Sequence, residues 1–167
     1  MPSSAGQMYH LLRRQMLRKQ RKPLIVFTPK SLLRHKDAAT TLEDIANDTF
    51  NTVIGEIDEI DTKKVKRVVA CAGKVYFDLL AARRERKIGN VALLRIEQLY
   101  PFDDRRFADE LKRYPNAKEL VWCQEEPLNQ GAWYAKAHRL VAVLRKGQEL
   151  KVVSRPASAS PAVGYAA

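Results

Sequence analysis

Apolar and polar positions alternate along this chain in blocks that predict strands and helices in turn. Four short apolar runs have the composition of strands buried in a sheet: residues 65–71, 91–96, 118–124 and 150–154. Three longer segments place apolar side chains at helical spacing: residues 74–87, the segment after Asp103, and residues 131–146. Strands that alternate with helices of this length predict crossover connections and a mainly parallel sheet.

The first part of the chain predicts a cationic helix that leads into the sheet. Ser4 and Gln7 have the S-x-x-Q spacing of a capping box, and apolar residues then recur at helical spacing until a proline disfavours helical geometry. Residues 24–27 form a continuously apolar run, which predicts a strand covered on both faces. Residues 41–44 predict the start of a short helix, and residues 52–54 predict an edge strand.

Individual residues predict where the central helices begin and which of their faces is buried. Gly73 marks a tight turn, and Asp103 has the side chain of a good N-cap. The helix over residues 74–87 is expected to bury one apolar stripe, made of Val75, Leu79 and Ala82. Its last turn, residues 83–87, carries four cations that complement the helix dipole, and we expect it to be solvated.

These elements predict an α/β fold. We expect a three-layer sandwich in which a mainly parallel sheet of about five or six strands has helices on both faces. The chain divides into a lead-in helix at residues 1–22, an α/β domain at residues 23–155 and an extended tail at residues 156–167, where two prolines disfavour regular structure. A length of 167 residues suits one domain with a substantial core.

Charge is distributed unevenly. The net charge is +11, and nine of these charges come from the segment before Asp37, which has no acid. Such a segment favours contact with a polyanion or with an acidic protein surface. Cys71 and Cys123 lie in apolar runs and are expected to be buried thiols. The spacing of cysteines and histidines predicts no metal site, and no apolar run or signal pattern indicates a membrane or secreted protein.

The stretch "CQEEPLNQGAWYAKAHRL", which begins at Cys123, has the residue types of an active site. It connects the carboxyl end of a strand to the next helix, where open α/β sheets bind ligands and partners. Two interpretations remain open: a corner of the fold whose Trp133 packs inward, or a surface that meets another subunit. Catalysis by Glu125 or Glu126 is disfavoured, because no nucleophile, histidine or second carboxylate stands at a suitable spacing. The Gly73-Lys74 pair likewise lacks the pattern of a phosphate-binding loop.

Four stretches, in this order, resemble one protein family: "YHLLRRQMLRKQRKPLIVFTPKSLLRH", "LLRIEQLYPF", "ELVWCQEEPLNQGAW" and "RPASASPAVGY". From near Met1 to its end the chain resembles the C-terminal region of bacterial 2-oxoglutarate dehydrogenases, which are thiamine-diphosphate-dependent enzymes. The resemblance implies a transketolase C-terminal-like domain of a longer protein. The Gly-Asp-Gly cofactor motif and the catalytic histidines of the family would lie in other domains, so we expect no catalytic, cofactor-binding or metal-binding residue here.

The resemblance also implies partners. Thiamine diphosphate and Mg²⁺ would bind elsewhere in the full-length cytoplasmic enzyme, and the partners would be its remaining domains, a homodimer partner and the dihydrolipoyl succinyltransferase component, with neither nucleic acid nor membrane. Six residues are expected to dock a subunit or domain: Gln124, Glu125, Glu126, Asn129, Gln130 and Trp133. Family members also respond to nucleotide-containing effectors. Arg13 and Arg14 are therefore either phosphate ligands or part of a surface helix that meets another domain.

Two other classes of function stay open at this point. A small basic adaptor for nucleic acid is supported by the cationic first segment and a pI near 9.8, but the chain has no recognisable nucleic-acid-binding motif. A free-standing regulatory module that binds the full enzyme is the other alternative.

Overall fold

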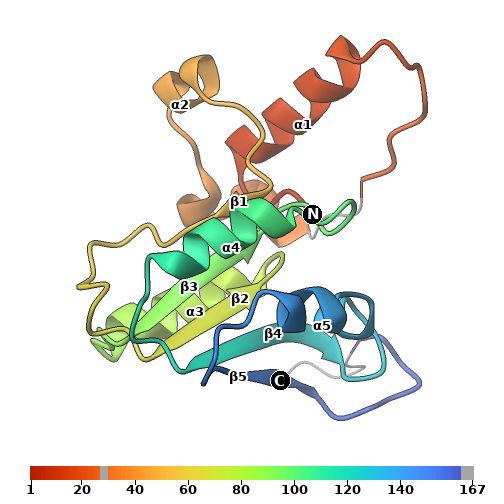
Figure 1. The fold of residues 1–167 in the computed structure, drawn as a ribbon. Helices are drawn as coiled ribbons and strands as arrows, with labels where there is room; N and C mark the ends of the chain where they lie inside the picture. The colour runs from red at the N-terminus through yellow and green to blue at the C-terminus, as the bar shows by residue number, and fades with distance from the viewer. Residues whose placement is uncertain (27–29, 163–167) are drawn as a thin grey trace.

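The computed structural model describes residues 1–26 and 30–162, in which five strands form one sheet (Figure 1). The helices are α1 (Ala5–Leu17), η1 (Lys30–Arg34), η2 (Lys36–Ala38), α2 (Leu42–Asn47), α3 (Val75–Glu85), α4 (Asp104–Lys112) and α5 (Trp133–Ala142). The strands are β1 (Val53–Ile54), β2 (Arg67–Cys71), β3 (Val91–Ile96), β4 (Glu119–Pro127) and β5 (Glu149–Arg155). None of the helices in these ranges is long and apolar enough to cross a bilayer.

The sheet has the order β1-β3-β2-β4-β5, and every neighbouring pair except β1 with β3 is parallel. This confirms the predicted α/β class, the mainly parallel sheet and the edge strand at residues 52–54. The short helix predicted to start in residues 41–44 is α2, and Thr41 caps it by accepting a hydrogen bond from Asp44 N. Helices α1 and α2 lie together beyond the β1 edge of the sheet (Figure 1).

Two hydrophobic cores, one on each face, hold the layers together. Successive side chains of a strand point to opposite faces, so each central strand contributes to both cores. One core joins Val68, Ala70, Ala92, Leu94, Ile96, Leu120 and Trp122 of the sheet to Phe107 and Leu111 of α4 and Leu140 of α5. The other joins Val69, Cys71, Leu93, Val121 and Cys123 to Tyr76, Phe77 and Leu80 of α3. Helices therefore cover both faces, and both cysteines are buried free thiols, as predicted.

The strand predicted at residues 24–27 was wrong. Residues 24–26 have no regular secondary structure, and Phe27 lies outside the described residues. Ile25 is 76% exposed, and within the described ranges no strand pairs with this segment. An apolar run indicates strand propensity, but a buried strand also needs a hydrogen-bonding neighbour and covering layers, which depend on distant parts of the chain.

The buried face of α3 also differs from the prediction. Tyr76, Phe77 and Leu80 face the core, whereas the predicted stripe of Val75, Leu79 and Ala82 is half-buried. Both sets recur at helical spacing. The set with two aromatic rings is turned inward, because aromatic side chains bury the larger area.

The first turn of α1 is anchored to the segment that precedes β1. Ser4 Oγ accepts a hydrogen bond from Gln7 N, as the capping box predicts. The Gln7 side chain, however, binds the backbone of Asn51, donating to its carbonyl oxygen at 2.7 Å and accepting from its N–H at 3.1 Å. Gly6 N donates to Thr40 Oγ1, and a Cβ on Gly6 would lie 2.6 Å from Thr40 Cγ2. Glycine is therefore required for this close approach.

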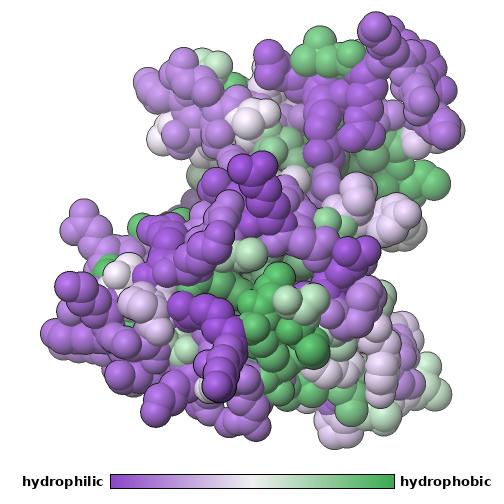
Figure 2. Space-filling view, in the orientation of Figure 1, coloured by the Kyte–Doolittle hydropathy of each residue, from purple (hydrophilic) through white to green (hydrophobic). Residues whose placement is uncertain are grey.

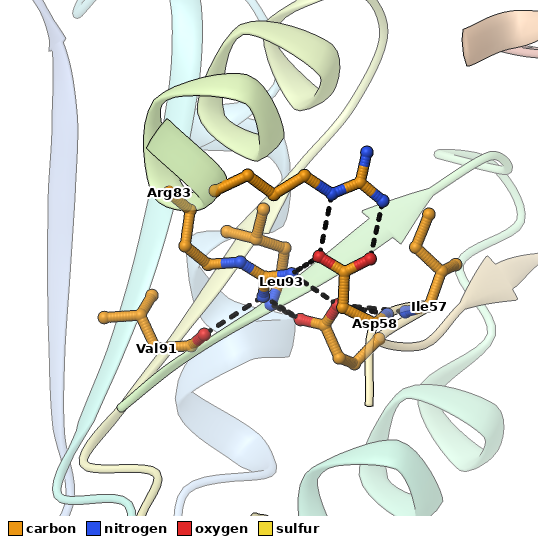
Figure 3. Close-up of polar contacts among 7 residues, drawn as sticks. Ile57, Asp58, Arg83, Val91 and Leu93 are labelled. Atoms are coloured by element: carbon orange, nitrogen blue, oxygen red, sulfur yellow. Dashed lines mark hydrogen bonds and ion pairs between the residues drawn. The ribbon is translucent and has the colours of Figure 1, made fainter. Parts of the chain in front are cut away.

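Arg83, expected in a solvated helix end, instead sits in a buried ion-pair cluster (Figure 3). Its guanidinium donates to both oxygens of Glu56, to Asp58 Oδ2 at 2.7 Å and to Val91 O at 3.1 Å. Glu56 also accepts from Leu93 N. The cluster thus ties the β1–β2 connection to α3 and β3. Hydrogen bonds from Arg84 and Arg83 lower the pKa of Asp58 to about 2.

We predict that Arg83→Ala lowers the free energy of unfolding by about 3–5 kcal/mol, because it leaves the Glu56 carboxylate buried without its cation. The neighbouring exposed cation provides a matched control, and Arg84→Ala should cost less than about 1 kcal/mol. Urea unfolding of both variants measures the difference. Equal losses would show that the cluster is no more stabilising than a surface ion pair.

Candidate functional site

The parallel strands β2, β3, β4 and β5 end at one edge of the sheet, which we call the carboxyl edge. Strand β4 reaches Pro127, further than predicted, so the turn to α5 occupies only residues 128–132. The segment from Gln124 to Trp133, here called the corner, therefore combines the end of a strand with a short loop. It contains all six residues predicted to dock a partner.

Gln124 holds the corner together from inside. The residue is 6% exposed, and its Oε1 accepts hydrogen bonds from Trp122 Nε1 at 2.9 Å and from Trp133 N at 3.1 Å. Its Nε2 donates to Pro127 O and Gln130 O, at 3.0 and 2.8 Å. One side-chain amide thus hydrogen-bonds polar groups of the strand end, the loop and the start of α5. Gln124 is accordingly a structural residue and not part of an exposed surface.

Gly131 makes room for this amide. Its φ is +69°, in the left-handed region that favours glycine, and a Cβ there would lie 3.0 Å from both terminal atoms of the Gln124 side chain. Helix α5 begins two residues later without a side-chain cap, because the Gln124 oxygen already binds the free N–H of Trp133.

Other residues of the corner form hydrogen bonds with Arg155 and Ser158, at the end of β5 and in the tail. Asn129 exchanges two hydrogen bonds with the backbone of Ser158, and Gln130 Nε2 donates to Ser158 O. Arg155 Nε donates to Glu125 O at 2.7 Å, and Arg155 O accepts from Leu128 N. Two motifs that are distant in sequence, "QEEPLNQGAW" and "RPASASP", therefore form one hydrogen-bonded unit.

Glu125 and Glu126 lack the surroundings of catalytic carboxylates. The Glu125 side chain is 49% exposed and lies 3.5 Å from Lys74 Nζ, which binds Asp78 more closely, at 2.6 Å. Glu126 lines an open hollow of about 280 Å³ whose other walls are mostly apolar, including Ala72, Leu99 and Trp122. The residues that line this hollow with Glu126 include neither a nucleophile nor a histidine. Burial raises the pKa of the nearby Cys123 thiol, which disfavours a nucleophilic thiolate.

Trp133 packs against the core on the α4 and α5 face, as the first interpretation of the corner predicts. On the side of the molecule shown in Figure 2, apolar surface gathers between α4 and α5. Of the six candidate docking residues, Glu125 and Asn129 are exposed, Glu126, Gln130 and Trp133 are partly exposed, and Gln124 is buried.

A second polar group at the carboxyl edge was not predicted. Glu97 is 0% exposed and accepts hydrogen bonds from the backbone and the hydroxyl of Ser3. Arg95 Nε lies 3.2 Å from Glu97 Oε1, and the Arg95 guanidinium stacks over the Tyr76 ring at 4.5 Å. The charged residues within the otherwise apolar run "VALLRIE" were the available signal, because charges are rarely buried unless paired.

The two arginines proposed as phosphate ligands lie on α1. Arg14 Nη1 donates to Gln98 Oε1 at 2.9 Å, and its guanidinium stacks over Phe50 at 4.1 Å. Arg13 is exposed, and both residues line a hollow of about 250 Å³ together with Arg18. Three guanidinium groups around one hollow form a basic surface suited to an anion.

Known proteins match this chain over nearly its whole length. A model of the family described as 2-oxoglutarate dehydrogenase C-terminal matches residues 39–167. The 2-oxoglutarate dehydrogenase E1 component of Haemophilus influenzae is 57% identical over 164 residues, which cover 98% of this chain and 18% of that protein. The proteins of the same name from Cupriavidus necator and Coxiella burnetii are 55% and 54% identical, over 98% and 99% of this chain and 17% and 18% of their own lengths. The chain thus spans less than a fifth of these relatives.

We predict that Gln124→Ala lowers the free energy of unfolding by about 3 kcal/mol, because it leaves the Trp122 indole N–H and several backbone groups of the corner without a partner. Gln130→Ala is the matched control. It removes the side-chain hydrogen bond to Ser158 and should cost about 1 kcal/mol or less. Thermal or urea unfolding distinguishes the two variants, and similar losses would contradict the structural role of Gln124.

Proposed function

This chain belongs to the 2-oxoglutarate dehydrogenase C-terminal family, and on that premise we propose that it is the C-terminal domain of an enzyme that oxidatively decarboxylates 2-oxoglutarate. The observation that carries the proposal is the identity of more than half of the residues to three E1 components over almost the entire chain. The relatives do not favour a nucleic-acid adaptor or a free-standing regulatory module. The complete enzyme would act in the cytoplasm and transfer the succinyl group to the lipoyl lysine of a succinyltransferase component.

The domain's own role in this proposal is support rather than chemistry. Its residues do not fit thiamine diphosphate with Mg²⁺, because the sequence has no Gly-Asp-Gly motif. Moreover, in residues 1–26 and 30–162 no three side chains of His, Cys, Asp or Glu converge in a way that could hold a metal ion. At the corner, the polar groups of Gln124, Asn129 and Gln130 are bonded within the fold. The cofactor would therefore be bound by other domains of the full-length protein.

The proposal predicts that the full-length protein, supplied with thiamine diphosphate and Mg²⁺, releases CO₂ from 2-oxoglutarate much faster than from pyruvate. The measurement is substrate-dependent reduction of an artificial electron acceptor, with CO₂ determined in parallel. A preference for pyruvate, or activity with neither acid, would overturn the assignment.

We further propose that the exposed members of the corner dock the homodimer partner or a neighbouring domain. Glu125 and Asn129 are the residues best placed for this, because their side chains are exposed beside the rigid Gln124 network. In the full-length protein, Glu125→Lys should weaken the dimer and lower turnover together, since it reverses a charge at the contact. Asp109→Lys, on the exposed face of α4, is the matched control. Sedimentation velocity that shows the same dimer stability in both variants would exclude the corner from the interface.

The hollow between Arg13, Arg14 and Arg18 supports a second candidate role, the binding of a phosphate-bearing effector. Arg13 is the residue to test, because Arg14 is already engaged by Gln98 and Phe50. Arg13→Ala should weaken the response of the full-length enzyme to ADP by about tenfold, the value of a charge-assisted hydrogen bond. Arg105→Ala, exposed on α4, should leave that response unchanged. An ADP titration that is identical for wild type and Arg13→Ala would remove the effector role.

A further inference from the structure

A polar cavity of about 580 Å³ lies between α1, α2 and the β1 edge of the sheet. This volume is within the range of small-molecule sites. Its walls include Gln7 and His10 of α1, Asp37 of η2, Asp44 of α2, Val53 and Ile54 of β1, Tyr76 of α3, Arg95 of β3 and Arg106 of α4. It has no lining residue in the corner, and it shares His10 with the hollow beside Arg13. The surface of α1 and α2 in this region is largely hydrophilic (Figure 2).

Arg95 is the buried cation of this cavity. The residue is 8% exposed, and its guanidinium is fixed by stacking over the Tyr76 ring and by the approach of Glu97 to its Nε. Glu97 forms an ion pair with Arg95 Nε at 3.2 Å, but this nitrogen has no hydrogen-bond partner among the described residues. A buried arginine normally has its donors satisfied. Arg95 therefore lines the cavity with a guanidinium whose Nε lies against Glu97 and has no hydrogen-bond partner among the described residues.

Two more buried groups at the cavity lack partners. The Tyr76 hydroxyl and His10 Nδ1 are enclosed, and neither has a hydrogen-bond partner among the described residues. Burial raises the pKa of Tyr76 to about 12, so its hydroxyl remains a neutral donor. Because burying an unpaired polar group costs free energy, three such groups at one cavity indicate a bound polar molecule.

The rim of the cavity has the opposite charge. Asp37 and Asp44 are exposed, and neither has an ion-pair partner within 4 Å in the described part of the chain. Asp48 also lines the cavity, but its carboxylate accepts hydrogen bonds from Thr49 N and from Asn51 Nδ2. Arg106, the other lining arginine, pairs with Glu110. The cavity thus has the Arg95–Glu97 ion pair at depth and two carboxylates without a described ion-pair partner at its opening.

We propose that this cavity binds a small zwitterion of the amino-acid class, with its carboxylate on Arg95 and its ammonium group toward Asp37 and Asp44. The planar guanidinium fork matches the two oxygens of a carboxylate. The acidic rim disfavours phosphate and dicarboxylates, because a second negative charge would face Asp37 and Asp44, whereas it attracts an ammonium group. A bound molecule would contact α1, α2 and the sheet at once and so stabilise their arrangement.

The test is isothermal titration calorimetry of the full-length protein with L-alanine and L-glutamine at up to millimolar concentration. Propionate lacks the ammonium group, ethylamine lacks the carboxylate, and succinate and inorganic phosphate carry additional negative charge. Arg95→Lys removes the guanidinium fork, and Asp44→Asn removes one rim charge from an exposed position. Asp109→Asn is the control for loss of an exposed acid elsewhere.

We expect at least one of the two amino acids to bind saturably, and propionate, ethylamine, succinate and phosphate to bind about tenfold more weakly or not at all. Arg95→Lys and Asp44→Asn should each weaken amino-acid binding several-fold, while Asp109→Asn should not. If Arg95→Lys fails to fold, as judged by circular dichroism, Asp44→Asn decides. Absence of saturable binding, equal binding of succinate, or binding that is unaffected by Asp44→Asn would overturn the proposal. None of these outcomes depends on the decarboxylase activity.

Discussion

The side-chain amide of Gln124 satisfies donors and acceptors from three separate segments at the carboxyl edge of the sheet. An amide has two donors and an acceptor oxygen with two lone pairs, and here the oxygen accepts twice while the nitrogen serves several carbonyl groups. Because these groups are largely removed from water, the end of β4, the loop and the first turn of α5 have to take positions that suit one planar group. The tail is then bonded to the same loop through Asn129 and Gln130.

At two other sites a buried polar side chain likewise positions separate segments through its hydrogen bonds. Glu56 accepts hydrogen bonds from both terminal nitrogens of Arg83, and Glu97 accepts hydrogen bonds from the backbone N–H and the hydroxyl of Ser3. In each case a buried carboxylate joins segments that are far apart in sequence, and in each case apolar packing alone would leave those segments free to shift. The fold is thus held by two apolar cores within the layers and by a few buried polar groups where connecting segments meet the layers.

Most of the fold could be predicted from local pattern, because strand and helix periodicity is encoded in neighbouring residues. The central strands, the Asp103 cap and the turn at Gly73 are all confirmed. The errors have two physical origins. The exposure of Leu24 and Ile25 and the burial of Arg83 depend on distant parts of the chain, and the inward face of α3 depends on competition between two possible faces. At the corner, the residue types could be read from the sequence but the directions of their side chains could not, so the inward-turned Gln124 could not be separated from the outward-turned Glu125.

Helix α1 is held to the rest of the fold at its first turn and again at Arg14. Gln7 binds the Asn51 backbone, and Arg14 donates to Gln98 and stacks over Phe50, whereas Met16 and Leu17 beyond it are 67% and 70% exposed. Thirteen residues of helix extend for about 20 Å. Because contacts near both of its ends set its direction, the helix gives a fixed starting point to the cations Arg18, Lys19, Arg21 and Lys22 that follow it.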